Sequence, residues 1–385
     1  MSRLNRLLAF IEHDAGNLAL RKDAIREACD AGQWEIVRSL IDAGLQSQPD
    51  DPELLAHSGF AYLHAQRYAD AERALSAALA RGLTAPDVQY NLVFSRFMQK
   101  RYADALDTLS EPVTRAVPLA LLLRARCLHH LGRPDEAIAD CKARIAAEPG
   151  DAEANGLLAL ILYERDQAEA AKEPIEAALK QDPQQLEALL ALGSMQSDVQ
   201  DYEVARRTFD TLLQAHPQCG RAWHALALVE LSNMHIEAAK RDIELAATHM
   251  PEHIGTWHVL AWIHLMLGDV LAAQAAFERA LAIDRNFGET HGGLAVTAAM
   301  QGDEDEAHLS IKRALRLDPQ SLSAKYAEIV LLHRHGKQEE AQRVFDSVLA
   351  RPVARSDMQY RDLVAAQIRR LGMHAAPNAI DTTYH

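Results

Sequence analysis

The sequence predicts an all-α fold, a solenoid in which antiparallel helix pairs stack one upon the next. Three observations predict it: alanine recurs every 34 residues, an apolar residue stands four residues after each alanine, and proline recurs in the same register. One interval is shorter, at 32 residues. A period of this length is typical of repeat proteins, in which each unit is one supersecondary element. The alanines are Ala71, Ala105, Ala137, Ala171, Ala205, Ala239, Ala273, Ala307 and Ala341.

The same register extends the array to ten units over residues 18–353, because one period before Ala71 lies Val37. When the alanine is numbered position 20 of its unit, position 8 is mostly small and position 15 is glycine in five units. Position 32 is proline in six units. Position 24 is apolar in all ten, as Ile41, Leu75, Leu109, Cys141, Ile175, Phe209, Ile243, Phe277, Ile311 and Phe345.

These positions define the structure expected for one unit. Each unit holds two helices of about 12–14 residues. Glycine at position 15 allows the turn between them, and small residues at positions 8 and 20 let the two helices touch. Proline at position 32 cannot continue a helix and therefore ends the second one. A single pair cannot bury its apolar faces, so neighbouring units must stack.

Two consecutive units carry the fullest pattern: Trp223, Ala227, Glu230, Ala239, Ile243, Ala246 and Pro251, then Trp257, Leu260, Ala261, Gly268, Ala273, Phe277 and Ala280. The pattern resembles the tetratricopeptide repeat family, and the resemblance covers nearly the whole chain. It implies a right-handed superhelix in which the first helix of each pair lines a concave face. It also implies that this face binds peptides or helices of partner proteins.

Both ends and one junction depart from the period. Residues 1–17 favour an N-terminal helix over 3–13. The third unit lacks two residues and contains Pro112, so we expect its second helix to stop near Ser110 and residues 111–117 to form a loop, either a tolerated deletion or a hinge. Ser356 is placed to cap a helix over 356–372 that would cover the last unit. Residues 373–385 have no period, and we expect a flexible tail.

The resemblance implies that positions 2, 5, 9, 12 and 13 of the first helices line the concave face, and the candidate groove residues stand at positions 5, 9, 12 and 13. Aromatic and methionine side chains there suit an extended peptide or an amphipathic helix with apolar anchors. The alternative is that some of them pack against the next repeat. The candidates are Phe60, Leu63, Tyr90, Phe94, Phe97, Met98, Arg126, His224, His258, Trp262, Leu265 and Met266, and the apolar stretches extend to Leu228, Leu231 and Met300.

The sequence gives little support for a carboxylate clamp, a metal site or a catalytic site. A family variant that clamps a terminal carboxylate requires lysine and asparagines, of which Asn91 alone matches. His224, His258 and His291 stand at similar positions of successive units, but stacked helices are about 10 Å apart, too far to share a metal ion. Catalytic and phosphate-binding motifs are not found in the sequence. We therefore expect no enzyme activity, metal or cofactor.

The composition disfavours some classes of partner and of cellular location. The formal net charge is -14, which disfavours nucleic acid and anionic membrane. The sequence lacks an apolar run of the roughly 18 residues that cross a bilayer, and the first 14 residues are not typical of a signal peptide. Four cysteines without Cys-x-x-Cys spacing suit a reducing compartment. We expect a cytoplasmic protein.

The sequence thus favours a protein-interaction scaffold or adaptor that binds a partner segment with apolar anchors along the concave groove. Two alternatives remain open at this stage. One is a chaperone for an exported or assembling subunit, and the other is the non-catalytic repeat partner of a protein-modifying enzyme. Self-association through an uncovered end of the solenoid is also possible.

Overall fold

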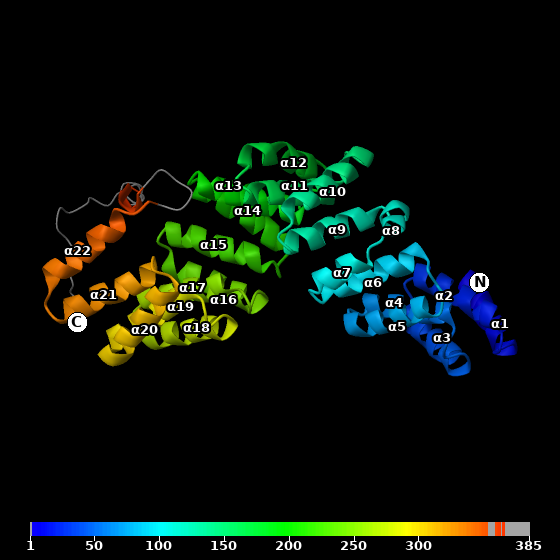
Figure 1. The fold of residues 1–385 in the computed structure, drawn as a ribbon. Helices are drawn as coiled ribbons and strands as arrows, with labels where there is room; N and C mark the ends of the chain where they lie inside the picture. The colour runs from blue at the N-terminus through cyan, green and yellow to red at the C-terminus, as the bar shows by residue number, and fades with distance from the viewer. Residues whose placement is uncertain (1, 353–358, 363, 366–385) are drawn as a thin grey trace. The chain divides into compact units, whose positions relative to one another are not determined.

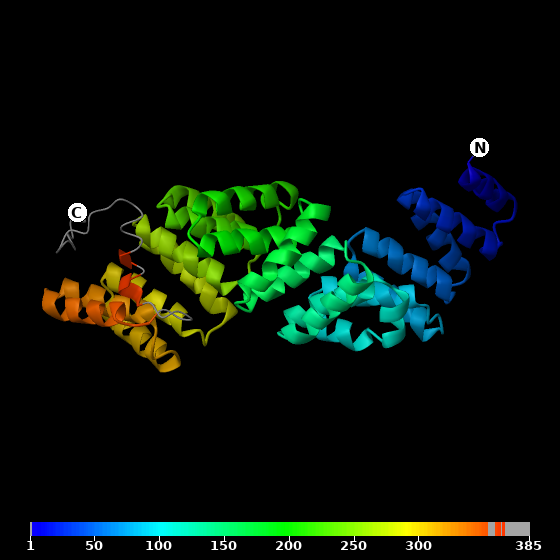
Figure 2. The ribbon, with the colours of Figure 1, turned by 90° about the horizontal axis from the view of Figure 1, so that it is seen from above.

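The computed structural model describes residues 2–352, 359–362 and 364–365, and the regular structure of this part of the chain is helical (Figure 1). Helices form antiparallel pairs, and within each of the two compact units of the chain each pair packs against the next (Figures 1 and 2). The chain divides into two compact units, Met1–Ala188 and Leu189–His385, with the division inside α13 (Leu186–Asp198). Each unit is a solenoid of stacked helix pairs.

The first unit begins with α1 (Arg3–His13), which Ser2 caps by accepting a hydrogen bond from the amide of Asn5. The pairs that follow are α2 (Leu18–Asp30) with α3 (Trp34–Ser47), α4 (Pro52–His64) with α5 (Tyr68–Ala80), α6 (Pro86–Met98) with α7 (Tyr102–Thr108), α9 (Leu119–His130) with α10 (Pro134–Ala147), and α11 (Ala152–Glu164) with α12 (Ala168–Gln181). The short helix α8 (Glu111–Ala116) lies between α7 and α9.

The second unit continues the same arrangement to the end of the repeats. After α13 come α14 (Tyr202–Ala215), α15 (Gly220–Ser232) with α16 (Ile236–His249), α17 (Ile254–Met266) with α18 (Val270–Ile283), α19 (Gly288–Gln301) with α20 (Glu304–Leu317), and α21 (Leu322–Arg334) with α22 (Gln338–Leu349). Among the described residues, no helix is long and apolar enough to cross a membrane.

The turn inside every pair uses one left-handed residue at position 15. Five of these residues are glycines with φ between 64° and 88°, namely Gly32, Gly132, Gly268, Gly302 and Gly336. The other five adopt the same conformation without being glycine, at φ between 56° and 61°: Gln66, Lys100, Asp166, Gln200 and Met234. The repeat geometry therefore imposes this conformation even where the side chain disfavours it.

Small residues at position 8 permit close packing within a pair. A Cβ atom added to Gly59 would lie 2.4 Å from Cγ of Leu75, and one added to Gly193 would lie 2.6 Å from Cε1 of Phe209. Leu75 and Phe209 occupy position 24 and are fully buried. The apolar side chain of the second helix thus fills the space that the missing Cβ leaves on the first.

The expectation of a loop over 111–117 is wrong, because residues Glu111–Ala116 form α8. Pro112 lies in the first turn of this helix, where the missing amide hydrogen costs nothing and the fixed φ favours the helix. Val113 is buried. The preceding helix α7 ends at Thr108, close to the expected stop. The predicted capping helix over 356–372 lies mostly outside the described residues, and the predicted tail over 373–385 lies wholly outside them.

Candidate partner-binding groove

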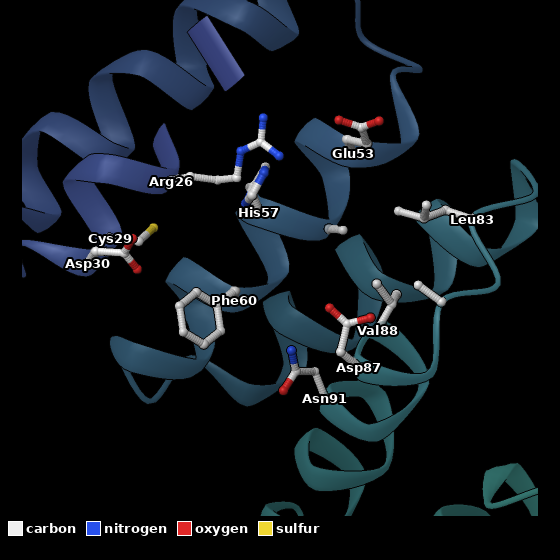
Figure 3. Close-up of a pocket in the computed structure, with 12 residues that line it drawn as sticks. Arg26, Cys29, Asp30, Glu53, His57, Phe60, Leu83, Asp87, Val88 and Asn91 are labelled. Atoms are coloured by element: carbon white, nitrogen blue, oxygen red, sulfur yellow. The ribbon is translucent and has the colours of Figure 1, made fainter. Parts of the chain in front are cut away.

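In the first unit, one cavity opens across the first helices of three successive pairs, α2, α4 and α6 (Figure 3). Its volume is about 540 Å³. These helices are brought together by the repeat itself, since each pair stacks on the next. The lining residues are Arg26, Cys29, Asp30, Glu53, Ala56, His57, Phe60, Leu83, Ala85, Asp87, Val88 and Asn91.

Phe60 is the large apolar side chain of this cavity, and 42% of it is exposed to solvent. Its ring lies 5.8 Å from the ring of Trp34, which in turn stacks on His64 with centroids 3.7 Å apart. Val88 is buried beneath the cavity. Phe60 is therefore held by neighbouring rings while one side of it stays open to a ligand (Figure 3).

Acidic groups outnumber cationic groups in the lining. Asp30, Glu53 and Asp87 carry carboxylates, and Arg26 is the cation. Arg26 forms an ion pair with Asp23. Burial, followed by the charge of Arg26, lowers the pKa of His57, so its imidazole is neutral near pH 7. The cavity is thus partly apolar and has a negative rim.

The remaining residues of the first predicted stretch lie mostly in the packing between helices. Leu63 packs against the buried cluster that contains Leu75. Tyr90, Phe94 and Phe97 pack against the next cluster along the array. Met98 is exposed, as Phe60 is. Of these six candidates, Phe60 and Met98 are therefore exposed to solvent, and the other four contribute to packing between helices.

Arg126, on α9, is engaged by two carboxylates from later repeats. Its guanidinium lies 3.1 Å from Glu153 on α11 and 3.0 Å from Glu187 on α13. Burial opposes its charge, but these two carboxylates together raise the pKa of Arg126. Arg126 thus ties three successive first helices together instead of offering a free cation to a partner.

In the second unit, two predicted groove histidines bond to threonines of the following repeat. His224 Nδ1 lies 3.1 Å from Oγ1 of Thr256, and His258 Nε2 lies 2.8 Å from Oγ1 of Thr290. Both threonines are fully buried. Burial, with a smaller contribution from His253, lowers the pKa of His224 to about 4, and burial also lowers the pKa of His258. These histidines are neutral links between repeats.

Trp262 and Leu265 also serve packing between repeats, since both contact the two buried clusters on either side of them. The ring of Trp262 meets Phe277 and Tyr326 edge-on, with centroids 6.1 and 5.7 Å apart. Met266 is different, because half of its surface is exposed. Leu228 and Met300 are exposed too. Across the described residues, no three metal-ligating side chains converge.

Phe60 was predicted from the sequence, and Asn91 was named only as a match to the carboxylate clamp, but the other polar residues of the cavity were not predicted. His57 and Asn91 stand at position 6 and Glu53 and Asp87 at position 2 of their units. Position 2 was recognised as groove-lining, yet its acidic residues were not compared between units. That comparison would also have found Glu153 and Glu187, the two partners of Arg126. The repeat pattern did not predict that Leu83 and Ala85, between α5 and α6, line the cavity.

Comparisons with known proteins agree with this architecture. A family model described as tetratricopeptide repeat matches residues 58–111, 97–152, 190–247 and 258–321, which together make up more than half of the chain. The structure of a human IFIT1 dimer with m7Gppp-AAAA is similar at a TM-score of 0.54 and 16% identity, over 89% of this chain and 92% of that one. No curated protein sequence matches the chain.

Two further solved structures are similar over a shorter part of the chain. One is pilF of Pseudomonas aeruginosa, at a TM-score of 0.49 and 18% identity, over 55% of this chain and 96% of that one. The other is a tetratricopeptide repeat protein from Parabacteroides merdae, at a TM-score of 0.49 and 18% identity, over 64% of this chain and 98% of that one.

Proposed function

The chain belongs to the tetratricopeptide repeat family, and from this premise we propose that it is a non-catalytic scaffold that binds a segment of a partner protein. The binding site is the cavity across α2, α4 and α6. The observation that carries the proposal is the exposed ring of Phe60 within a cavity of about 540 Å³. A concave site with an exposed aromatic anchor is the usual form of a binding pocket.

A protein partner fits this site better than a nucleic acid does. The human IFIT1 structure holds a capped oligonucleotide, but the likeness to it is one of fold. This chain has a formal net charge of -14, and three carboxylates line its cavity. A phosphate backbone would be repelled by both.

The buried thiols suit a reducing compartment, and we propose the cytoplasm as the place of action. Cys127 and Cys141 are buried inside the first unit. Burial raises the pKa of Cys127 to about 11, and burial together with Asp140 raises that of Cys141 to about 12. Both therefore remain protonated and behave as small apolar core residues.

The test compares two phenylalanines, of which one alone lines the cavity. Phe60→Ala removes the anchor, whereas Phe10→Ala changes a more exposed phenylalanine on α1. The full chain and both variants capture partners from native cell extract, and calorimetry then gives the Kd of the captured segment. We expect Phe60→Ala to weaken binding at least about fivefold, as loss of an anchor of 1 kcal/mol or more does.

Circular dichroism and thermal melting establish that both variants are folded. An unchanged Kd for folded Phe60→Ala would refute binding in this cavity. Equal losses in both variants would show that general exposed apolar surface, and not this site, holds the partner.

A further inference from the structure

The charges around the cavity restrict what can occupy it. Its lining carries three carboxylates against one guanidinium, and that guanidinium is already paired with Asp23. Glu53 is engaged by Lys22 at 3.3 Å, but Lys22 is closer to Asp51, at 2.8 Å. Arg26 and Lys22 are therefore each paired with a carboxylate outside the cavity, Asp23 and Asp51, and the excess charge inside the cavity is negative.

Two of the three carboxylates are available to a ligand. Within the described part of the chain, the carboxylates of Asp30 and Asp87 take part in no hydrogen bond or ion pair, and both residues are exposed. Asp30 is the last residue of α2, where the helix dipole disfavours a carboxylate. Asp87 lies in the first turn of α6, where the helix dipole favours a carboxylate. Helix stability therefore explains the position of Asp87 but not that of Asp30.

The carboxylates and the apolar anchor belong to the same cavity. Figure 3 shows Asp87 and Asn91 on α6 on one side of the ring of Phe60, and Asp30 on α2 on its other side. A single short segment can therefore meet the ring and a carboxylate together. A side chain that complements the carboxylates must be cationic, and one that complements Phe60 must be apolar or aromatic.

We propose that the cavity across α2, α4 and α6 selects an extended partner segment in which a lysine or arginine lies next to an apolar or aromatic residue. The apolar side chain packs on Phe60, and the basic side chain reaches Asp87 on one side of the ring or Asp30 on the other. Asn91 offers an amide that can bond the backbone of the segment. This inference rests on the proposed function and adds the chemical class of the partner.

The test is selection of a phage-displayed random peptide library on the full chain, with parallel selection on Phe60→Ala. We expect the peptides lost on Phe60→Ala to be enriched in lysine or arginine within two residues of an aromatic or aliphatic residue. Synthetic versions of these peptides then measure the contribution of each carboxylate. Asp87→Asn or Asp30→Asn, according to the side of Phe60 on which the basic residue lies, should weaken binding about two- to fivefold, as loss of an exposed ion pair does.

The matched control is Asp42→Asn, which neutralises an exposed carboxylate on α3, away from the cavity. It should leave affinity unchanged, and added salt should weaken the wild-type complex more than the complex of the aspartate variant that has lost affinity. Circular dichroism and thermal melting show whether each variant is folded, because Asp87 also favours its helix.

The results of this selection distinguish failure of this inference from failure of the proposed function. Peptides that depend on Phe60 but lack basic residues would overturn this inference and leave the proposed function standing. If none of the selected peptides depended on Phe60, both would fail. Self-association of the chain that disappears in Phe60→Ala, seen by light scattering, would assign the cavity to a second copy and overturn the inference.

Discussion

The guanidinium of Arg126 lies 3.0 Å from the carboxylate of Glu187, although 61 residues separate them in the sequence. The contact joins two first helices that are not consecutive pairs, because α11 intervenes and contributes Glu153 to the same guanidinium. Position 9 of one repeat thus reaches position 2 of the next and of the one after it. The position of Arg126 in the repeat predicts that it binds a partner, but its contacts stabilise the stacking of the repeats instead.

Removal of Arg126 should therefore cost stability. We expect Arg126→Ala to lower the free energy of unfolding by about 2 kcal/mol, because the largely buried carboxylate of Glu187 loses its cation. The exposed carboxylate of Glu153 should contribute little to this loss. Urea unfolding followed by circular dichroism measures this change. Arg115→Ala is the control, since the pair between Arg115 and Glu111 is exposed and should contribute less than about 0.5 kcal/mol. Equal effects of the two substitutions would contradict the role assigned to Arg126.

Acid should destabilise the second unit through His224. Its pKa in the folded chain is about 4, below the ordinary value of 6.5, so the unfolded chain binds the proton more readily than the folded one. Stability from this group is complete above pH 6.5 and is lost as the pH falls toward 4, by at most about 3 kcal/mol. His224→Gln should flatten that part of the pH dependence of the melting temperature.

The left-handed turn residues give a test of backbone strain. No atom lies within 4 Å of a Cβ added to Gly268, whose φ is +79°, so Gly268→Ala changes backbone preference without a clash. We expect a loss of about 1 kcal/mol in unfolding free energy. Met234→Gly introduces glycine at the equivalent turn and should be neutral or slightly stabilising. A neutral Gly268→Ala would show that the turn tolerates a side chain.

These cases show which features the sequence could predict. The helix pairs follow from local chemistry, because Ala71 and its equivalents, the turn glycines and the apolar residue at position 24 recur at fixed spacing. The helix at Glu111–Ala116 was missed because Pro112 was interpreted as a helix breaker, although proline is compatible with a first turn. The left-handed backbone conformation of Met234 could not be predicted from the sequence either, because methionine has no preference for it.

The candidate site was harder to predict than the fold. A position in the repeat specifies that a side chain lies near the groove, but it does not specify whether that side chain bonds to the next repeat. Phe60 stays open, whereas Arg126 and His258 are used by neighbouring repeats. This distinction depends on contacts between residues 27 to 61 apart in the sequence, and those contacts exist only once the repeats have stacked.

Hydroxyl-radical footprinting of the complex with a selected peptide tests the central claim most directly, because it reports the solvent exposure of individual side chains. Phe60 and Phe10 are both exposed in the unbound chain, so each is oxidised and the second serves as an internal control. The account predicts that the bound peptide reduces oxidation of Phe60 and leaves that of Phe10 unchanged. A tightly bound peptide that leaves Phe60 as reactive as before would contradict it.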